Sequence, residues 1–237
     1  MKLLRCFLPI LLLTLPVQAA AQAAAPASNS IAKRVQPCTV CHGQEGRATN
    51  AGYFPRIAGK PAGYLYAQLL NFRDGRRQNA AMQGLIDTLS DDYLRQIASH
   101  FAALDLPYPP PLPAQAGAAA LSRGEALVLQ GDRARGVPAC ASCHGAAMTG
   151  AAPAATAAVP GLLGLPRDYL MAQLGAWRAG LRKATAPDCM AQVATRLSAE
   201  DLSAVASWLA AQPVPGDARP AARGAGPLPL DCGPQPP

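Results

Sequence analysis

The chain repeats itself, and this duplication constrains its fold more than any other feature. The segment "FPRIAGKPAGYLYAQLLNFRDGRR" at residues 54–77 returns as "VPGLLGLPRDYLMAQLGAWRAGLR" at residues 159–182, with its prolines, glycines and several apolar residues in register. A shorter motif, "CTVCHG" at residues 38–43, returns as "CASCHG" at residues 140–145. Self-similarity at a nearly fixed offset indicates repeated structural units. The sequence therefore predicts two copies of one small domain.

A proline-rich segment separates the two copies. Residues 104–120 read "LDLPYPPPLPAQAGAAA". Proline fixes φ and removes a backbone donor, so such a stretch forms a semi-rigid extended spacer. We therefore expect a first domain at residues 28–106, a linker at 107–120 and a second domain at 121–212. Residues 213–237 are also rich in proline and are expected to form an irregular tail.

Both copies are predicted to be helical, because apolar residues recur at helical spacing and no alternating strand pattern is present. Helices are expected within residues 62–75 and 90–104, and in the segment after Ser198. Ser90 and Ser198 are suited to cap helix N-termini. Ser122 is predicted to begin the first helix of the second copy. The expected fold class is all-α, with two tandem units.

The first residues have the composition of a secretory signal. Lys2 and Arg5 precede an apolar run at residues 7–17, and small residues follow. A helix that spans a bilayer needs roughly 20 apolar residues, so this run is too short to be one. We therefore expect residues 1–21, with an approximate cleavage site, to be removed. The mature chain is expected to be a soluble periplasmic protein without a transmembrane anchor.

The charge and composition narrow the possible partners. The formal net charge of +7 falls to +5 once Lys2 and Arg5 are removed. Basic residues are interspersed with acidic ones and form no run, so nucleic acid is not an expected partner. Aromatic residues make up only 5% of the chain. Each small domain therefore needs another source of large apolar surface to complete its core.

The repeated C-x-x-C-H motif has a specific chemistry, the covalent attachment of c-type haem. Two thiols one short turn apart can add to two vinyl groups of the macrocycle, and the adjacent imidazole can ligate the iron. The sequence therefore predicts two covalently bound haem c groups. The predicted thioether residues are Cys38, Cys41, Cys140 and Cys143, and the predicted axial histidines are His42 and His144.

Two other uses of paired cysteines are less consistent with this sequence. A thioredoxin-like redox pair requires a βαβ context, which the helical pattern does not provide. Two C-x-x-C pairs could together bind zinc. Both pairs, however, are followed directly by histidine in a chain with an export signal, and this favours haem.

Methionine is the expected second axial ligand, because a thioether opposite histidine gives a high-potential iron suited to electron transfer. After the initiator, Met82 is the only methionine of the first copy, and it is predicted to lie on a loop. Met190 precedes its Leu-Ser pair by the same seven residues as Met82 and is the predicted ligand of the second copy. Met148 and Met171 are expected to pack in the protein.

Two cysteines remain outside the motifs. In an exported protein, Cys189 and Cys232 are expected to form a disulfide that ties the tail to the Met190 segment. Alternatively, the Cys189 thiolate could ligate the second iron, which would lower its potential and indicate chemistry on sulfur compounds. His100, in the predicted last helix of the first copy, is expected to pack or to face solvent.

Both motifs, the duplicated helix region and the two methionines together resemble the cytochrome c4 family, over essentially the whole mature chain. The resemblance implies a periplasmic dihaem electron carrier that feeds a terminal oxidase or accepts electrons from periplasmic dehydrogenases. It also implies that the Pro55 and Pro160 carbonyls orient the two histidines. Arg73 and Arg178 are candidates for contacts with the haem propionates, or else simply surface arginines.

Two functional classes therefore remain open. The first is a mobile carrier, in which no bond-making chemistry takes place. The second is an electron-accepting subunit of a periplasmic dehydrogenase, or a haem enzyme that acts on sulfur compounds. The chain departs from the family in its Cys189 and Cys232 pair and its long proline-rich tail. The departures leave the identity of its partner open.

Overall fold

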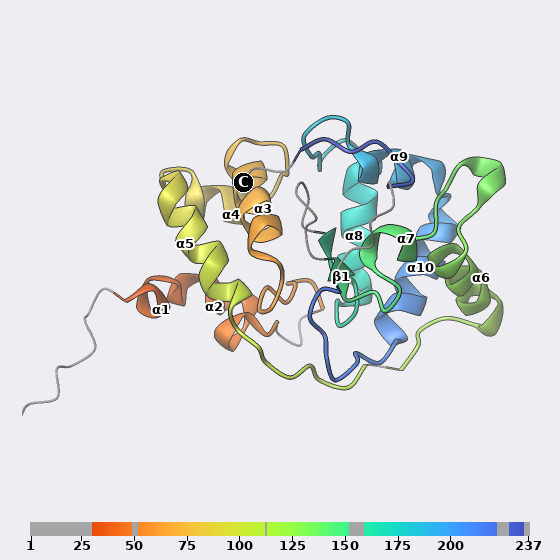
Figure 1. Ribbon diagram of the computed structural model, residues 1–237, viewed down its shortest axis with the longest axis horizontal. Helices are drawn as coiled ribbons and strands as arrows, with labels where there is room; N and C mark the ends of the chain where they lie inside the picture. The colour runs from red at the N-terminus through yellow and green to blue at the C-terminus, as the bar shows by residue number, and fades with distance from the viewer. Residues whose placement is uncertain (1–29, 49–51, 112, 152–158, 222–227, 235–237) are drawn as a thin grey trace, which may run out of the picture.

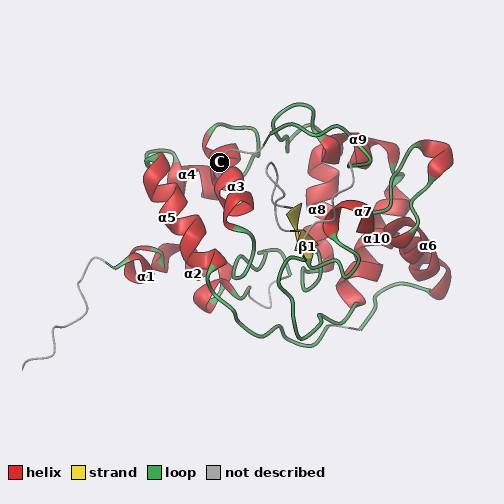
Figure 2. Ribbon diagram, viewed as in Figure 1, coloured by secondary structure: helices red, strands yellow, loops and turns green. Residues whose placement is uncertain are grey.

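The computed structural model of the protein describes residues 30–48, 52–111, 113–151, 159–221 and 228–234. The predicted signal at residues 1–21 lies outside them. Two helical halves lie side by side, and the proline-rich linker runs along one edge of the molecule between them (Figure 1). Long irregular segments connect short helices in both halves (Figure 2). None of the helices in the described part of the chain is long and apolar enough to cross a membrane.

The first half contains five α-helices and a 3-10 turn among its described residues. Helices α3 and α5 pack against each other and enclose a core in which Leu94 and Phe101 are almost fully buried. The elements are α1 (Ile31–Arg34), α2 (Gln36–His42), η1 (Gln44–Gly46), α3 (Ala62–Arg73), α4 (Ala80–Ile86) and α5 (Asp91–Ala102).

The second half repeats this plan around helix α10, which packs on both α6 and α8. Its core includes Leu127, Val128 and Leu209, all nearly inaccessible to solvent. A two-residue ribbon pairs β1 with β2 in antiparallel register. The elements are α6 (Ala118–Leu129), η2 (Arg133–Arg135), α7 (Ala141–His144), β1 (Gly150–Ala151), β2 (Val159–Pro160), α8 (Arg167–Arg178), α9 (Cys189–Arg196) and α10 (Ala199–Ala211).

Helix starts follow local sequence chemistry, with one correction. The Ser90 side chain accepts from the Tyr93 amide at the start of α5, and Ser198 forms a reciprocal capping box with Asp201 at the start of α10. Helix α6, in contrast, begins at Ala118 and not at Ser122. The prediction was wrong because a run of alanines, the strongest helix formers, extends the helix toward its N-terminus.

The halves meet through a reciprocal set of hydrogen bonds. Arg77 of the first half donates to the Tyr169 hydroxyl and the Gln173 side chain of α8. Its repeat counterpart, Arg182, donates to Tyr64 and Gln68 of α3. Backbone bonds link Gln78 to Leu181 and Lys183 to Arg76 beside these arginines. Equivalent residues therefore exchange equivalent contacts, as expected for two related units that face each other.

The linker is held against the first half by one buried arginine. Arg56 donates to the carbonyls of Leu106 and Pro107, and its guanidinium lies over the Tyr108 ring at 3.9 Å from the centroid. Tyr108 would in turn collide with a side chain at Gly164, so this part of the linker passes close to the second half. The segment is extended but tied to both halves.

Candidate functional site

Each C-x-x-C-H motif lies on a short helix that ends at its histidine. Cys38 and Cys41 are on α2, which has Pro37 near its start and His42 as its last residue. In the second half, Cys140 is the N-cap of α7 and His144 ends it. One helical turn places both sulfurs on the same face, since residues three apart are neighbours on a helix. The arrangement matches the spacing that two thioether bonds require.

Both histidines are oriented by a proline carbonyl. Nδ1 of His42 lies 2.8 Å from the Pro55 oxygen, and Nδ1 of His144 lies 2.8 Å from the Pro160 oxygen. A carbonyl oxygen can only accept, so Nδ1 carries the proton and donates it. The lone pair of each ring is therefore on Nε2, where a metal can take it.

Burial also keeps these rings in the ligand form. It lowers the pKa of both His42 and His144, and this effect is only partly opposed by the hydrogen bonds to the carbonyls. A nearby positive charge lowers each pKa further, from Arg77 at His42 and from Lys60 at His144. Neutral imidazole is the form that ligates iron.

The glycine after each histidine is required by the backbone. Gly43 has φ of 76° and Gly145 has φ of 83°, in the left-handed region that favours glycine. A Cβ on Gly43 would overlap the Ala48 carbonyl, and one on Gly145 would lie 2.8 Å from the Gly150 carbonyl oxygen. Both motifs therefore end in the same kind of tight turn.

The motif thiols are partly covered. Burial raises the pKa of Cys38, and it raises the pKa of Cys140 to about 11. Both groups are therefore neutral thiols at neutral pH. Among the described residues, no cluster of histidine, cysteine and carboxylate side chains could hold a metal ion by itself.

The two predicted methionine ligands begin short helices and do not lie on loops. Met82 is the third residue of α4, where Asn79 caps the helix by accepting from the Met82 amide. Met190 is the second residue of α9, which Asp188 caps in the same way. The expected loop position of Met82 is therefore wrong, because the asparagine cap starts a helix there.

The methionines differ in what they contact. Met82 packs against the first core, as does Cys38. Met190 is half-buried at the start of α9 and is not among the described residues that pack on the second core. Met148 is inside that core and Met171 packs against it. Among the described methionines of the second half, Met190 is therefore the one outside the second core cluster.

Cys189 and Cys232 are joined by a disulfide, with a Cα–Cα distance of 5.3 Å. The bond attaches the tail to the first residue of α9, next to Met190. The tail is held further by Val214 and Leu230, which pack against the second core. In this structure the Cys189 sulfur is therefore bonded to sulfur and does not offer a thiolate.

Arg73 and Arg178 both lie toward the surface. Arg73 donates to Asp91 at 2.7 Å and to Asp74 at 3.3 Å, while Arg178 is exposed at the end of α8. Besides Arg56, which holds the linker, the buried arginines among the described residues are Arg77 and Arg182, only 8% and 5% exposed. Their hydrogen-bond partners are neutral. The repeat contained both residues, but sequence spacing alone did not indicate that they would be buried.

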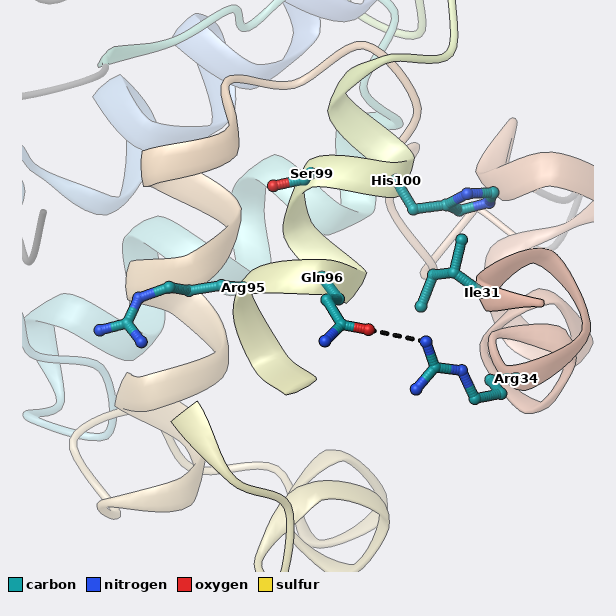
Figure 3. Close-up of a pocket in the computed structure, with 6 residues that line it drawn as sticks. All are labelled: Ile31, Arg34, Arg95, Gln96, Ser99 and His100. Carbon is teal, nitrogen blue, oxygen red and sulfur yellow. Dashed lines mark hydrogen bonds between the residues drawn. The ribbon is translucent and has the colours of Figure 1, made fainter. Parts of the chain in front are cut away.

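A surface pocket of about 530 Å³ lies between α1 and α5, and no residue of either C-x-x-C-H motif lines it. It is lined by Ile31, Arg34, Arg95, Gln96, Ser99 and His100 (Figure 3). Arg34 donates to Gln96 at 2.6 Å, while Arg95 extends away from His100. The polar groups therefore do not converge on one point. His100 is half-buried, with its ring edge against Phe101, so it packs at the surface.

Comparisons with known proteins agree with this geometry. The family profile described as Cytochrome c matches residues 121–212. Cytochrome c4 of Pseudomonas aeruginosa (strain PAO1) is 36% identical over 200 residues, which cover 84% of this chain and 94% of the relative. The chain belongs to the cytochrome c4 family.

Two further similarities concern thiosulfate dehydrogenases. A protein of Thiomonas intermedia (strain K12) named thiosulfate dehydrogenase electron acceptor is 40% identical over 192 residues, 81% of this chain and 86% of the relative. The structure of thiosulfate dehydrogenase (TsdBA) from Marichromatium purpuratum matches with a TM-score of 0.66 and 32% identity. That match covers 74% of this chain but only 36% of the other.

As a member of the cytochrome c4 family, the chain is an all-α dihaem c-type cytochrome and an electron carrier. It carries two covalently bound haem c groups, one at Cys38 and Cys41 and the other at Cys140 and Cys143. The donor sets fit this cofactor, because each half pairs two sulfurs on one turn with an imidazole whose Nε2 is available. A bound haem iron supplies a reversible one-electron change.

Proposed function

We propose that this cytochrome accepts electrons from a thiosulfate dehydrogenase and passes them to a second partner. The observation that carries the proposal is the 40% identity to a thiosulfate dehydrogenase electron acceptor, over 86% of that relative. The TsdBA structure adds support, because this cytochrome resembles about a third of a longer chain with that title. Both similarities favour the predicted dehydrogenase partner. A terminal oxidase as the next acceptor stays a prediction.

The proposal includes four axial ligands, His42 with Met82 and His144 with Met190. The proline carbonyls fix both histidines with Nδ1 as donor, which supports Nε2 as the ligating atom. Met190 is supported by its position outside the packed core. A histidine and methionine pair leaves no open position on the iron. The residues therefore favour a carrier over a haem enzyme.

The proposed setting is the periplasm, after removal of residues 1–21. The disulfide between Cys189 and Cys232 is consistent with an oxidising compartment. We retain the two domains at residues 28–106 and 121–212, the linker at 107–120 and the tail at 213–237 as part of the proposal, with the first turn of α6 beginning inside the predicted linker at Ala118. The separate cores of the two halves support this division.

The partner is tested by following the visible spectrum of the oxidised cytochrome. With thiosulfate and a catalytic amount of thiosulfate dehydrogenase, we expect both haems to be reduced, whereas thiosulfate alone leaves them oxidised. Reduction by thiosulfate alone would contradict the carrier role and favour the enzyme. The dehydrogenase partner is contradicted if dithionite reduces the cytochrome fully but the dehydrogenase with thiosulfate does not.

A further inference from the structure

A buried lysine of the first half reaches into the second half. Lys60 is 5% exposed, and its ammonium donates to the carbonyl oxygen of Gly161 at 2.9 Å. Within the described ranges, no carboxylate lies within ion-pair distance of it. Burying an ammonium is costly unless it is paired, and the described protein offers it one acceptor, a neutral carbonyl oxygen.

The contact is next to the hydrogen bond that orients the second axial histidine. Gly161 directly follows Pro160, whose carbonyl accepts from Nδ1 of His144 at 2.8 Å. The ammonium is close enough to lower the pKa of His144. The ammonium therefore disfavours additional positive charge at the second motif, although Lys60 belongs to the first half.

The second half does not supply an equivalent lysine to the first motif. The position equivalent to Lys60 in the duplicated segment is Leu165, an apolar residue of the second core. His42 is influenced instead by Arg77, a permanent cation of its own half. The two halves thus differ in the positive charge that acts on the axial histidine. His144 is influenced by a lysine of the other half that can lose its proton, and His42 by an arginine of its own half that cannot.

We propose that the positive charge of Lys60 tunes the potential of the second haem. It favours the reduced state of the haem bound at Cys140 and Cys143. Oxidation adds one positive charge at the iron. A fixed ammonium nearby disfavours oxidation, because repulsion between like charges is weakly screened in the low-dielectric interior. Lys60 therefore raises the potential of the second haem and directs electrons from the first half to the second. The inference rests on His144 as the ligand and does not depend on which dehydrogenase is the partner.

The charge of Lys60 can also be titrated. Burial and then the positive charge of Arg56 lower the pKa of Lys60 to about 8. The charged and titratable groups around it are Arg56 on the same loop and His144 across the interface, while Tyr108 and Asp105 lie beside Arg56. Below pH 8 the ammonium is present and the second potential is high. As the pH rises through about 8 the proton is lost, so that potential falls.

Redox titration of the intact dihaem protein from pH 6 to 10 tests this inference. Each haem is assigned from the paramagnetically shifted resonances of its own C-x-x-C-H segment. In Lys60→Met and Lys60→Gln, we expect the equilibrium constant for transfer from the first to the second haem to fall about tenfold at pH 7, which is about 59 mV for one electron. Both variants should also lose the change near pH 8.

Comparison of the variants separates charge from structure. Lys60→Gln can keep a donor to Gly161 without the charge, and a further variant, Lys60→Arg, keeps a charge that does not titrate. Lys60→Arg should keep the high potential across the pH range, and Lys33→Met, at an exposed lysine of α1, should change nothing. The inference is overturned if Lys60→Gln retains the wild-type potential, or if the first haem shifts as much as the second. If the wild type has histidine–methionine spectra at both haems but no step near pH 8, the titration of Lys60 is overturned while the ligand assignment stands, and Lys60→Gln still decides the effect of its charge.

Discussion

At the scale of single residues, the contribution of a carboxylate to stability depends on where it lies and on its partners. The buried Asp201 carboxylate receives hydrogen bonds from Arg135 at 2.6 Å and Arg123 at 2.9 Å, and it also closes the cap of α10. Burial alone would raise the pKa of Asp201, but these arginines outweigh it and lower the pKa to about 2. Asp92, at the start of α5, forms only an exposed pair with Arg95.

We expect Asp201→Asn to lower the free energy of unfolding by about 2 kcal/mol at pH 7, because it removes charged hydrogen bonds at a buried site. The folded pKa is depressed, so this stabilisation is present above about pH 4 and is lost as the pH falls toward 2. Urea unfolding at pH 7 and at pH 2.5 measures it. Asp92→Asn is the control and should change stability by less than about 1 kcal/mol. An equal loss at both pH values would contradict the account.

The axial methionines give the second residue-scale prediction. Met82→His and Met190→His should each lower the potential of one haem by a sizeable part of the roughly 0.8 V range that axial ligands control, because methionine opposite histidine raises the potential. Met171→Leu, which changes a packing residue of α8, is the control and should leave both potentials in place. Spectroelectrochemistry measures both values. Unchanged potentials in Met190→His would show that another group ligates the second iron.

At the scale of elements, the sequence predicted helices better than their contacts. Ser90 and Ser198 begin helices as expected, because a cap is a local interaction. The start of α6 was placed too late, at Ser122, because helix propensity in the preceding alanines overrode the cap. Repeat spacing predicts Met190 as a ligand but could not indicate that α9 begins at Cys189, since that boundary depends on Asp188 as a cap.

The turn after each histidine is an element whose geometry can be tested. Gly145→Ala should destabilise the second half by about 1–2 kcal/mol, because the left-handed backbone and the nearby Gly150 carbonyl leave no space for a methyl group. Gly175→Ala, inside α8 with nothing within 4 Å of a Cβ, should stabilise by roughly 0.5–1 kcal/mol. Thermal unfolding of the two variants compares them. If both glycines respond alike, the turn is not the reason for Gly145.

The Cys189–Cys232 disulfide links the last element to the tail. Its cysteines are 43 residues apart in the sequence. Changing both to serine should therefore lower the free energy of unfolding by about 2–4 kcal/mol. The spectrum of the second haem should remain that of histidine and methionine ligation. Denaturant unfolding and the visible spectrum of the double variant check the two statements. A changed axial spectrum with unchanged stability would favour Cys189 as a ligand.

At the scale of the whole molecule, duplication explains both the likeness and the difference of the two halves. The repeat predicted two equivalent units, and the reciprocal bonds of Arg77 and Arg182 join them through equivalent residues. It could not predict that Lys60 crosses the interface, because that contact pairs a residue with a carbonyl about a hundred positions away. Long-range contacts of this kind are set by packing and leave no local pattern in the sequence.

The number of haems attached to the mature chain tests the central claim most directly. Intact-mass measurement of protein matured with the haem-attachment machinery should give the polypeptide without its first residues plus two haems. Cys38→Ala with Cys41→Ala should remove one of them, and so should Cys140→Ala with Cys143→Ala. A mass equal to that of the bare polypeptide, or one haem in the unaltered protein, would contradict the account.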